Sequence, residues 1–107
     1  MSTDGQTVPP ELTNAIKMLG DEWTLQIICN LSRNKLRFNE LQRAVEGINP
    51  STLVNRLKKM EKEKIIKREE ETLDKLSVVY ELTPKGRSFL PVTIELRKFA
   101  EKFYKKS

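Results

Sequence analysis

The best helix start in the sequence lies in the stretch GINPSTLVNRLKKMEKEK, which runs from Gly47 to Lys64. Asn49 followed by Pro50 is typical of a helix start, because the Asn side chain accepts a bond from a free N–H and Pro suits the first helical position. The pattern predicts a helix that ends at about Lys62. With Gly47 in the turn before it and another helix predicted upstream, residues 39–62 are expected to form a helix-turn-helix.

The two sides of this helix differ in chemistry. At 100° per residue, apolar residues gather on one side and predict a core-facing stripe: Leu53, Val54, Leu57 and Met60. The opposite side carries small hydrogen-bonding residues first and lysines later, with Arg and Lys on its flanks: Ser51, Thr52, Asn55, Arg56, Lys58, Lys59 and Lys62. Such a face is typical of a solvated amphipathic helix. It is also typical of a helix against DNA, where N-terminal residues reach base edges and lysines bind phosphates.

Three helices are predicted upstream. Residues 11–19 place apolar residues at helical spacing, and Gly20 is suited to end that helix. Residues 22–31 form a second helix, mostly core, which includes Trp23. After the extended connector RNKLRF, a third helix begins at Asn39, which is expected to form a capping box with Gln42.

Downstream, the period changes to that of a β-strand. Residues 65–70 and 77–82 alternate and are expected to pair as a hairpin, with a turn at residues 73–76. A hairpin directly after the helix-turn-helix is a wing. A last helix is predicted from residue 84 to about 104, kinked near Arg87 by Pro91, with an apolar seam at heptad spacing. The fold class is therefore mainly α with a small β-hairpin (α+β).

Composition narrows the possible functions. A chain of 107 residues is expected to form one domain, residues 11–107, after a flexible arm of residues 1–10. It has no histidine and one cysteine, which removes the commonest general base and any Cys-based zinc site, so neither enzyme activity nor a cofactor is expected. Without a secretory signal or an apolar run of roughly 18–20 residues, a cytoplasmic protein with no membrane partner is expected.

The positive charge is concentrated. Of the net charge of +5, residues 51–68 carry seven basic and two acidic side chains, whereas the segments on either side are close to neutral. A local excess of this kind indicates a polyanionic partner. Together with the turn and the hairpin, it favours DNA binding over the solvated-helix interpretation.

With these pieces in order, the chain resembles the HxlR-type, MarR-like winged-helix regulators of prokaryotes. The resemblance rests on LGDEWTLQII (19–28), LRFNELQRAVEGINPSTLVNRLKKMEKEKII (36–66) and VYELTPKGRSFLPV (79–92), in the family's order and spacing. It implies a homodimer that binds double-stranded DNA at a palindromic operator. It also implies dimerisation through the helices at residues 11–20 and 84–104, which fits their apolar positions: Leu12, Ile16, Leu19, Phe89, Val92, Leu96, Phe99 and Phe103.

The chain departs from the family pattern at two places. The family often has Gly-Lys before the tryptophan, where this chain has Asp21 and Glu22. Some members carry a redox-sensing cysteine just before the first helix, and the corresponding TVPPEL has none. Cys29 lies on the second helix instead, and we expect it to be a small core residue.

Further DNA contacts are predicted outside the recognition helix of residues 50–62, beside and within the third helix and in the wing formed by residues 65–82: Arg37, Asn39, Arg43, Lys67, Arg68 and Lys75. Glu69, Glu70 and Glu71 would repel phosphates at a wing tip. The leading hypothesis is a homodimeric, sequence-specific transcriptional regulator. The alternative is a winged-helix module for protein–protein contact in a transcription-related complex, and a small-molecule effector is a third, weaker option.

Overall fold

The computed structural model describes residues 7–71 and 77–105. Its elements, in chain order, are α1 (Pro10–Leu19), α2 (Glu22–Asn30), β1 (Leu36–Arg37), α3 (Phe38–Ala44), α4 (Pro50–Lys62), β2 (Ile66–Glu70), β3 (Val78–Leu82), α5 (Pro84–Arg87) and α6 (Leu90–Phe103). The mainly helical fold with a small sheet is confirmed, and the winged helix-turn-helix occupies its middle.

The core lies where α2, α3, α4 and the sheet meet. Ile27 of α2, Leu31 directly after α2, Leu41 of α3 and Leu53 of α4 are fully buried, each at 0% exposure. Most of the apolar stripes predicted for these helices therefore face one shared core. Trp23 is half-buried and packs against the rim of that core.

The helix-turn-helix forms where the sequence predicts it. The Asn49 Oδ1 accepts a hydrogen bond from the Thr52 N–H at 2.8 Å, and Pro50 occupies the first turn of α4. Gly47 has a φ of +87°, a left-handed conformation that favours glycine and lets the chain turn between α3 and α4.

The sheet has three strands instead of the predicted two. Its order is β1-β3-β2, and both pairs are antiparallel. Arg68 of β2 lies opposite Tyr80 of β3, and Leu36 of the predicted connector lies opposite Tyr80 on the other side. The predicted turn at residues 73–76, including Lys75, lies outside the described residues.

Helix α3 begins one residue earlier than predicted, and the capping box at Asn39 is wrong. Arg37 ends β1 in an extended conformation and becomes the residue that precedes the helix. The Glu40 carboxylate then accepts a hydrogen bond from the Arg37 N–H at 2.7 Å. Pairing of β1 with β3 sets this start, so the carboxylate and not Gln42 reaches back to the helix terminus.

The single C-terminal helix predicted for residues 84–104 is two helices. The Thr83 Oγ1 accepts a bond from the Gly86 N–H at 3.0 Å and caps α5, which ends at Arg87. Pro91 then lies in the first turn of α6, where its missing N–H costs no helical bond. The predicted kink is therefore a break between two helices.

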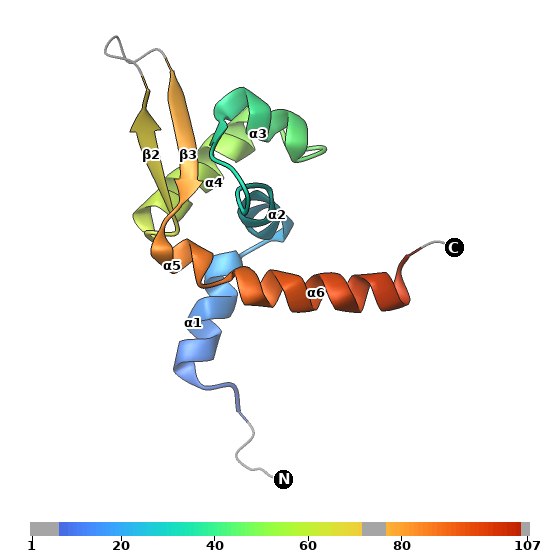
Figure 1. Cartoon of the computed structure of the whole chain (residues 1–107). Coiled ribbons are helices and arrows are strands. Elements are labelled where there is room, and N and C mark those ends of the chain that lie inside the picture. Colours follow the sequence, from blue (N-terminus) through green and yellow to red (C-terminus); the bar gives the residue numbers. More distant parts are fainter. Residues whose placement is uncertain (1–6, 72–76, 106–107) are drawn as a thin grey trace.

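The molecule is elongated because α1 and α6 project from the core (Figure 1). Its radius of gyration is 16.1 Å, compared with about 13 Å for a compact domain of this length. Of the predicted N-terminal arm, residues 1–6 lie outside the described residues, and Pro10 belongs to α1. None of the helices in the described ranges has the length and apolarity to span a membrane.

Candidate nucleic-acid interface

Helix α4 presents one row of polar side chains directly away from the core. Leu53, Leu57 and Met60 are at most 2% exposed and define its inner side. At 100° per residue, four exposed residues fall closest to the opposite direction: Ser51, Asn55, Lys58 and Lys62. We call these four residues the outward row.

Three other predicted contact residues on α4 lie to one side of the outward row. Thr52 is half-buried, and its N–H is bound to the capping Asn49. Lys59 is exposed, and its Nζ lies beside the turn between α1 and α2, 3.1 Å from where a Cβ on Gly20 would stand. Arg56 is half-buried and turns farther toward α2.

Arg56 is bound to Asp21 at the start of α2. Its Nε donates to the Asp21 Oδ2 at 2.5 Å, and a second guanidinium nitrogen contacts the same oxygen. The Asp21 Oδ1 accepts from the N–H groups of Trp23 and Thr24 at 3.1 and 3.3 Å, so it caps α2. The hydrogen bond from Arg56 holds the pKa of the Asp21 carboxyl below its usual value, against the opposing effect of burial. The contacts of Arg56 therefore favour an ion pair within the protein over the predicted role in DNA binding.

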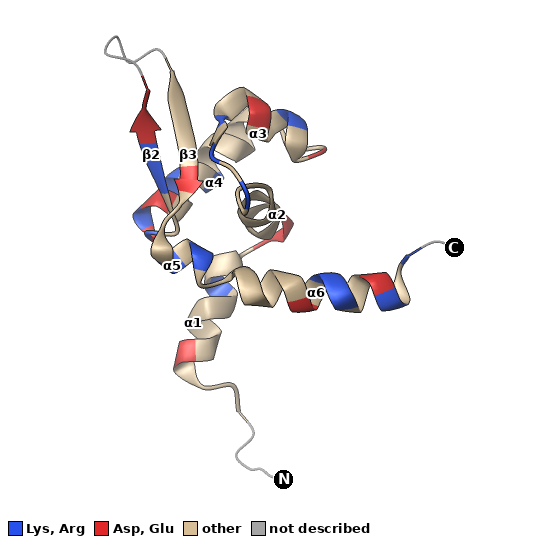
Figure 2. Cartoon of the chain, in the orientation of Figure 1, with Lys and Arg blue, Asp and Glu red and all other residues tan. Residues whose placement is uncertain are grey.

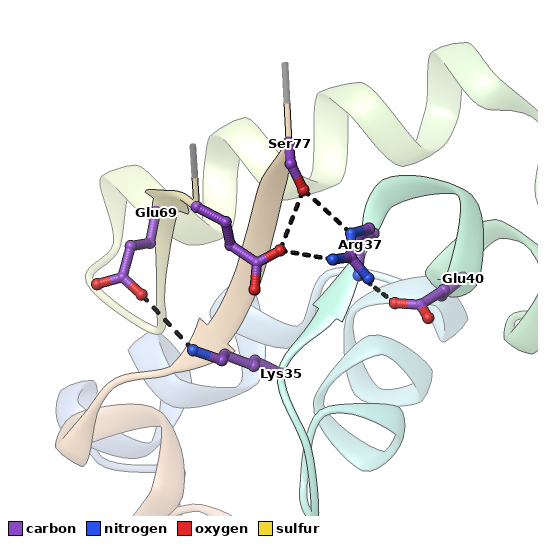
Figure 3. A network of polar contacts seen from close by, with 6 residues as sticks. Lys35, Arg37, Glu40, Glu69 and Ser77 are labelled. Atoms are coloured by element: carbon purple, nitrogen blue, oxygen red, sulfur yellow. Dashed lines mark hydrogen bonds and ion pairs between the residues drawn. The ribbon is translucent and has the colours of Figure 1, made fainter. Parts of the chain in front are cut away.

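The wing and the start of α3 share a network of opposite charges (Figure 3). A guanidinium nitrogen of Arg37 lies 2.7 Å from the Glu71 carboxylate, and the Arg37 Nε donates to the Ser77 hydroxyl at 3.1 Å. Lys35 lies 3.9 Å from Glu69. Part of the acidic run that would repel phosphates is thus neutralised within the protein, and Arg37 is engaged in doing so.

The basic residues of β2 differ in what holds them. The Lys67 ammonium forms an ion pair with Glu81 on β3 at 2.9 Å, and this carboxylate raises the pKa of Lys67. Arg68 is exposed beside a hollow of about 270 Å³ between α4 and the sheet, which it lines together with Lys58 and Tyr80. Figure 2 shows that positive charge on β2 lies near α4, whereas its far end is acidic.

On α3, Asn39 and Arg43 are exposed, and Arg43 has no ion pair within the part of the chain that the structure describes. Arg68 is also exposed and has no ion pair among the described residues. Of the six contacts predicted outside α4, these three are therefore available to a polyanion, while Arg37 and Lys67 are paired and Lys75 lies outside the described residues.

The projecting helices expose apolar side chains. Six of the eight residues predicted for a dimer interface are 45–60% exposed in the single chain: Leu12, Ile16, Val92, Leu96, Phe99 and Phe103. We call these six the terminal-helix face. The other two, Leu19 and Phe89, are half-buried and pack against the core. The Phe99 and Phe103 ring centroids are 5.0 Å apart, so the aromatic part of the face is one cluster.

Cys29 is not a core residue, contrary to the prediction. Its side chain is half-buried and lines a largely apolar cavity of about 470 Å³ between α2 and α6, together with Leu25 and Leu96. Burial raises the pKa of the Cys29 thiol, an effect opposed by the charge of Arg97. The projection of α6 leaves this side of α2 uncovered. Within the described ranges, no group of acidic, Cys or His side chains is arranged to hold a metal ion.

A protein-family model for HxlR-like helix-turn-helix proteins matches residues 18–107. The chain belongs to the HxlR-like helix-turn-helix family. Its relatives include the HTH-type transcriptional regulator YodB of Bacillus subtilis, 31% identical over 92% of this chain and 88% of the relative. Another is the uncharacterised HTH-type regulator YvaP of the same organism, 30% identical over 85% and 84%.

Solved structures agree with this HxlR-like fold. A MarR-family regulator from Porphyromonas gingivalis superposes with a TM-score of 0.82 at 29% identity, over 96% of this chain and 98% of the other. The reduced form of YodB superposes with a TM-score of 0.78 at 29% identity, over 92% and 97%. The predicted family, the winged-helix fold and the role as a DNA-binding regulator of transcription are thereby confirmed.

Proposed function

We propose that this HxlR-like regulator acts in the cytoplasm as a homodimer that binds a two-fold symmetric site on double-stranded DNA. The outward row of α4 is the observation that carries this proposal. This helix is the second of a helix-turn-helix, and it faces solvent with small polar residues first and lysines after them. Such a helix suits the major groove.

Within the outward row, the residues divide by reach and chemistry. Ser51 and Asn55 are in the first half of α4, where side chains meet base edges, and an Asn amide can pair with adenine through two hydrogen bonds. Lys58 and Lys62, with Lys59 beside them, bind phosphates and supply affinity that does not depend on sequence. Thr52 lies in the first turn of α4, and its half-buried side chain can contact only DNA atoms that come close to the helix.

Outside α4, Asn39, Arg43 and Arg68 are the proposed phosphate contacts. Arg37 and Lys67 reach DNA only if they leave their ion pairs with Glu71 and Glu81. We therefore rank these two below the three exposed residues. Lys75 remains a proposed wing contact that rests on the sequence alone.

A second copy of the chain is proposed to cover the terminal-helix face. Six large apolar residues on the two projecting helices are 45–60% exposed, more apolar surface than a monomer in water would favour. Two-fold pairing of this face would also place two α4 helices on one DNA duplex, with half-site centres about 34 Å apart or a multiple of that.

Selection of bound sequences from a random DNA library tests the proposal. The expected product is a consensus with two-fold symmetry, and a footprint on it that covers two successive major grooves. The alternative function, a module for protein–protein contact, would yield no consensus, with only weak binding that falls steeply as salt is added.

A further inference from the structure

Arg56 occupies a place on α4 that does not suit a DNA contact. It lies on the side of the helix that faces α2, and its side chain is only 31% exposed. Both of its described contacts go to one carboxylate oxygen of Asp21. To reach a phosphate, this side chain would have to give up an ion pair that is already formed in the protein.

Asp21 stands where three segments meet. It follows Gly20, at which α1 ends, and it caps the first turn of α2 through its Oδ1. Its Oδ2 receives Arg56 from the middle of α4. Asp21 therefore follows the projecting helix α1, and its carboxylate joins the start of the central core helix to the recognition helix.

The geometry of the pair matters more than its energy. Half-exposed ion pairs contribute little to stability, because water screens them and the side chains lose entropy. The guanidinium is planar, however, and its two contacts with one carboxylate oxygen fix the direction of the Arg56 side chain. The apolar contacts of Leu53, Leu57 and Met60 hold α4 against the core, and the pair to Asp21 restricts rotation about the helix axis.

We propose that Asp21 and Arg56 form a strut that orients α4 so that its outward row meets the bases, and that neither residue itself contacts DNA. Both are thus positioning residues for sequence recognition. The inference rests on the proposed function, since it assigns these two residues to the same DNA site. It replaces the expectation that Arg56 is a flanking DNA contact.

The strut and a direct phosphate contact by Arg56 predict opposite results for Asp21. If Arg56 binds phosphate, Asp21→Asn releases it and removes a negative charge, so DNA affinity rises on every sequence. If the pair is a strut, Asp21→Asn disturbs the orientation of α4 and affinity falls on the selected site alone. Asn keeps the ability to cap α2, so the helix start is preserved in this variant.

The experiment measures binding of the wild type, Asp21→Asn, Arg56→Gln, the double variant and Arg56→Lys. Fluorescence anisotropy follows titration of a selected symmetric site and of its scrambled sequence, at several salt concentrations. Glu22→Gln is the matched control, because it removes the same charge from the adjacent exposed residue. Circular dichroism sets a temperature at which every variant is folded.

The strut predicts a loss of about tenfold on the selected site for each neutral variant, with no further loss in the double variant. Binding to scrambled DNA and the salt slope stay as in the wild type, Glu22→Gln has no effect, and Arg56→Lys recovers part of the loss. If one neutral variant does not fold, the other single variant and Arg56→Lys carry the comparison.

Three results overturn the strut. They are higher affinity for Asp21→Asn, a salt slope lowered by about one unit in Arg56→Gln, and unchanged discrimination in both single variants. The proposed function fails separately, if the wild type itself binds both DNA molecules equally. In that case the strut falls with it, whereas the three results above leave the function standing.

Discussion

The polar side chains of α4 divide according to what each one touches. Ser51, Asn55, Lys58 and Lys62 point away from the core, while Arg56 is bound to Asp21. Helical spacing is enough to predict the first group. The second needs tertiary structure, because Asp21 and Arg56 are 35 positions apart and no local pattern links them.

Asn55 is expected to carry sequence preference. Asn55→Ala should weaken binding to the selected site by roughly 1–3 kcal/mol, because one amide–base contact is lost. Binding to scrambled DNA should not change. Anisotropy titrations measure both, with Asn34→Ala, an exposed amide before β1, as the control. Equal losses on the two DNA molecules would remove the base-reading role of Asn55.

Thr24 offers a test of the core. Its side chain is 0% exposed, and its Oγ1 has no hydrogen-bond partner within the described residues. Thr24→Val keeps the shape and removes an unsatisfied hydroxyl, so the free energy of unfolding should rise by about 1 kcal/mol. Urea denaturation measures the change. Thr93→Val should not gain stability, because the Thr93 hydroxyl already donates to the Leu90 carbonyl at 2.7 Å.

Among the elements, the helices are the part most readily predicted from sequence. The Asn-Pro start of α4 and its apolar stripe are local signals that the core confirms. Strand β1 is two residues long, and only its pairing with β3 makes it a strand, so it reads as a connector. The same pairing moves the start of α3, so the residue that precedes the helix is Arg37 and not a residue that local spacing favours.

The packing of α5 against the sheet depends on Gly86. A Cβ at this buried position would stand 2.2 Å from the Ile65 carbonyl oxygen, which is backbone and has little room to move. Gly86→Ala should therefore destabilise the protein by about 1–3 kcal/mol or more through overpacking. Thermal unfolding followed by circular dichroism measures it.

Gly47→Asn provides the comparison. The nearest atom to a Cβ there is a Trp23 ring carbon at 3.8 Å, and Asn tolerates a positive φ better than other side chains. A loss at Gly86 no larger than the loss at Gly47 would show that α5 moves away from the Ile65 backbone at little cost.

The whole molecule combines a compact DNA-binding part with two projecting helices. Heptad spacing predicts the apolar seam of the last helix, and the structure leaves most of it exposed. Sequence does not place the cavity beside Cys29, because that cavity depends on how α6 leaves the core. Sequence likewise does not show that the acidic residues of the wing are partly neutralised, because Arg37 and Lys35 meet them only in the folded chain.

Dimerisation of the whole molecule is expected to depend on the aromatic cluster of α6. Phe99→Glu should convert the protein to a monomer, because it places a charge in the aromatic cluster of the terminal-helix face. Sedimentation velocity measures the change in mass, and binding to the symmetric site should weaken in parallel. Glu101→Gln is the control on the same helix. A wild type that sediments as a monomer would contradict the dimer.

The proposed function depends on the claim that α4 reads a DNA sequence. The decisive measurement is fluorescence anisotropy of the wild type at 50 and 200 mM salt, on a selected symmetric site and on its scrambled sequence. Affinity is expected to fall by about 10³–10⁵ over this range for 6–10 phosphate contacts. Added salt is predicted to weaken both complexes, while the selected site remains at least about 10³-fold tighter. Equal affinity for the two DNA molecules at both salt concentrations would contradict the claim.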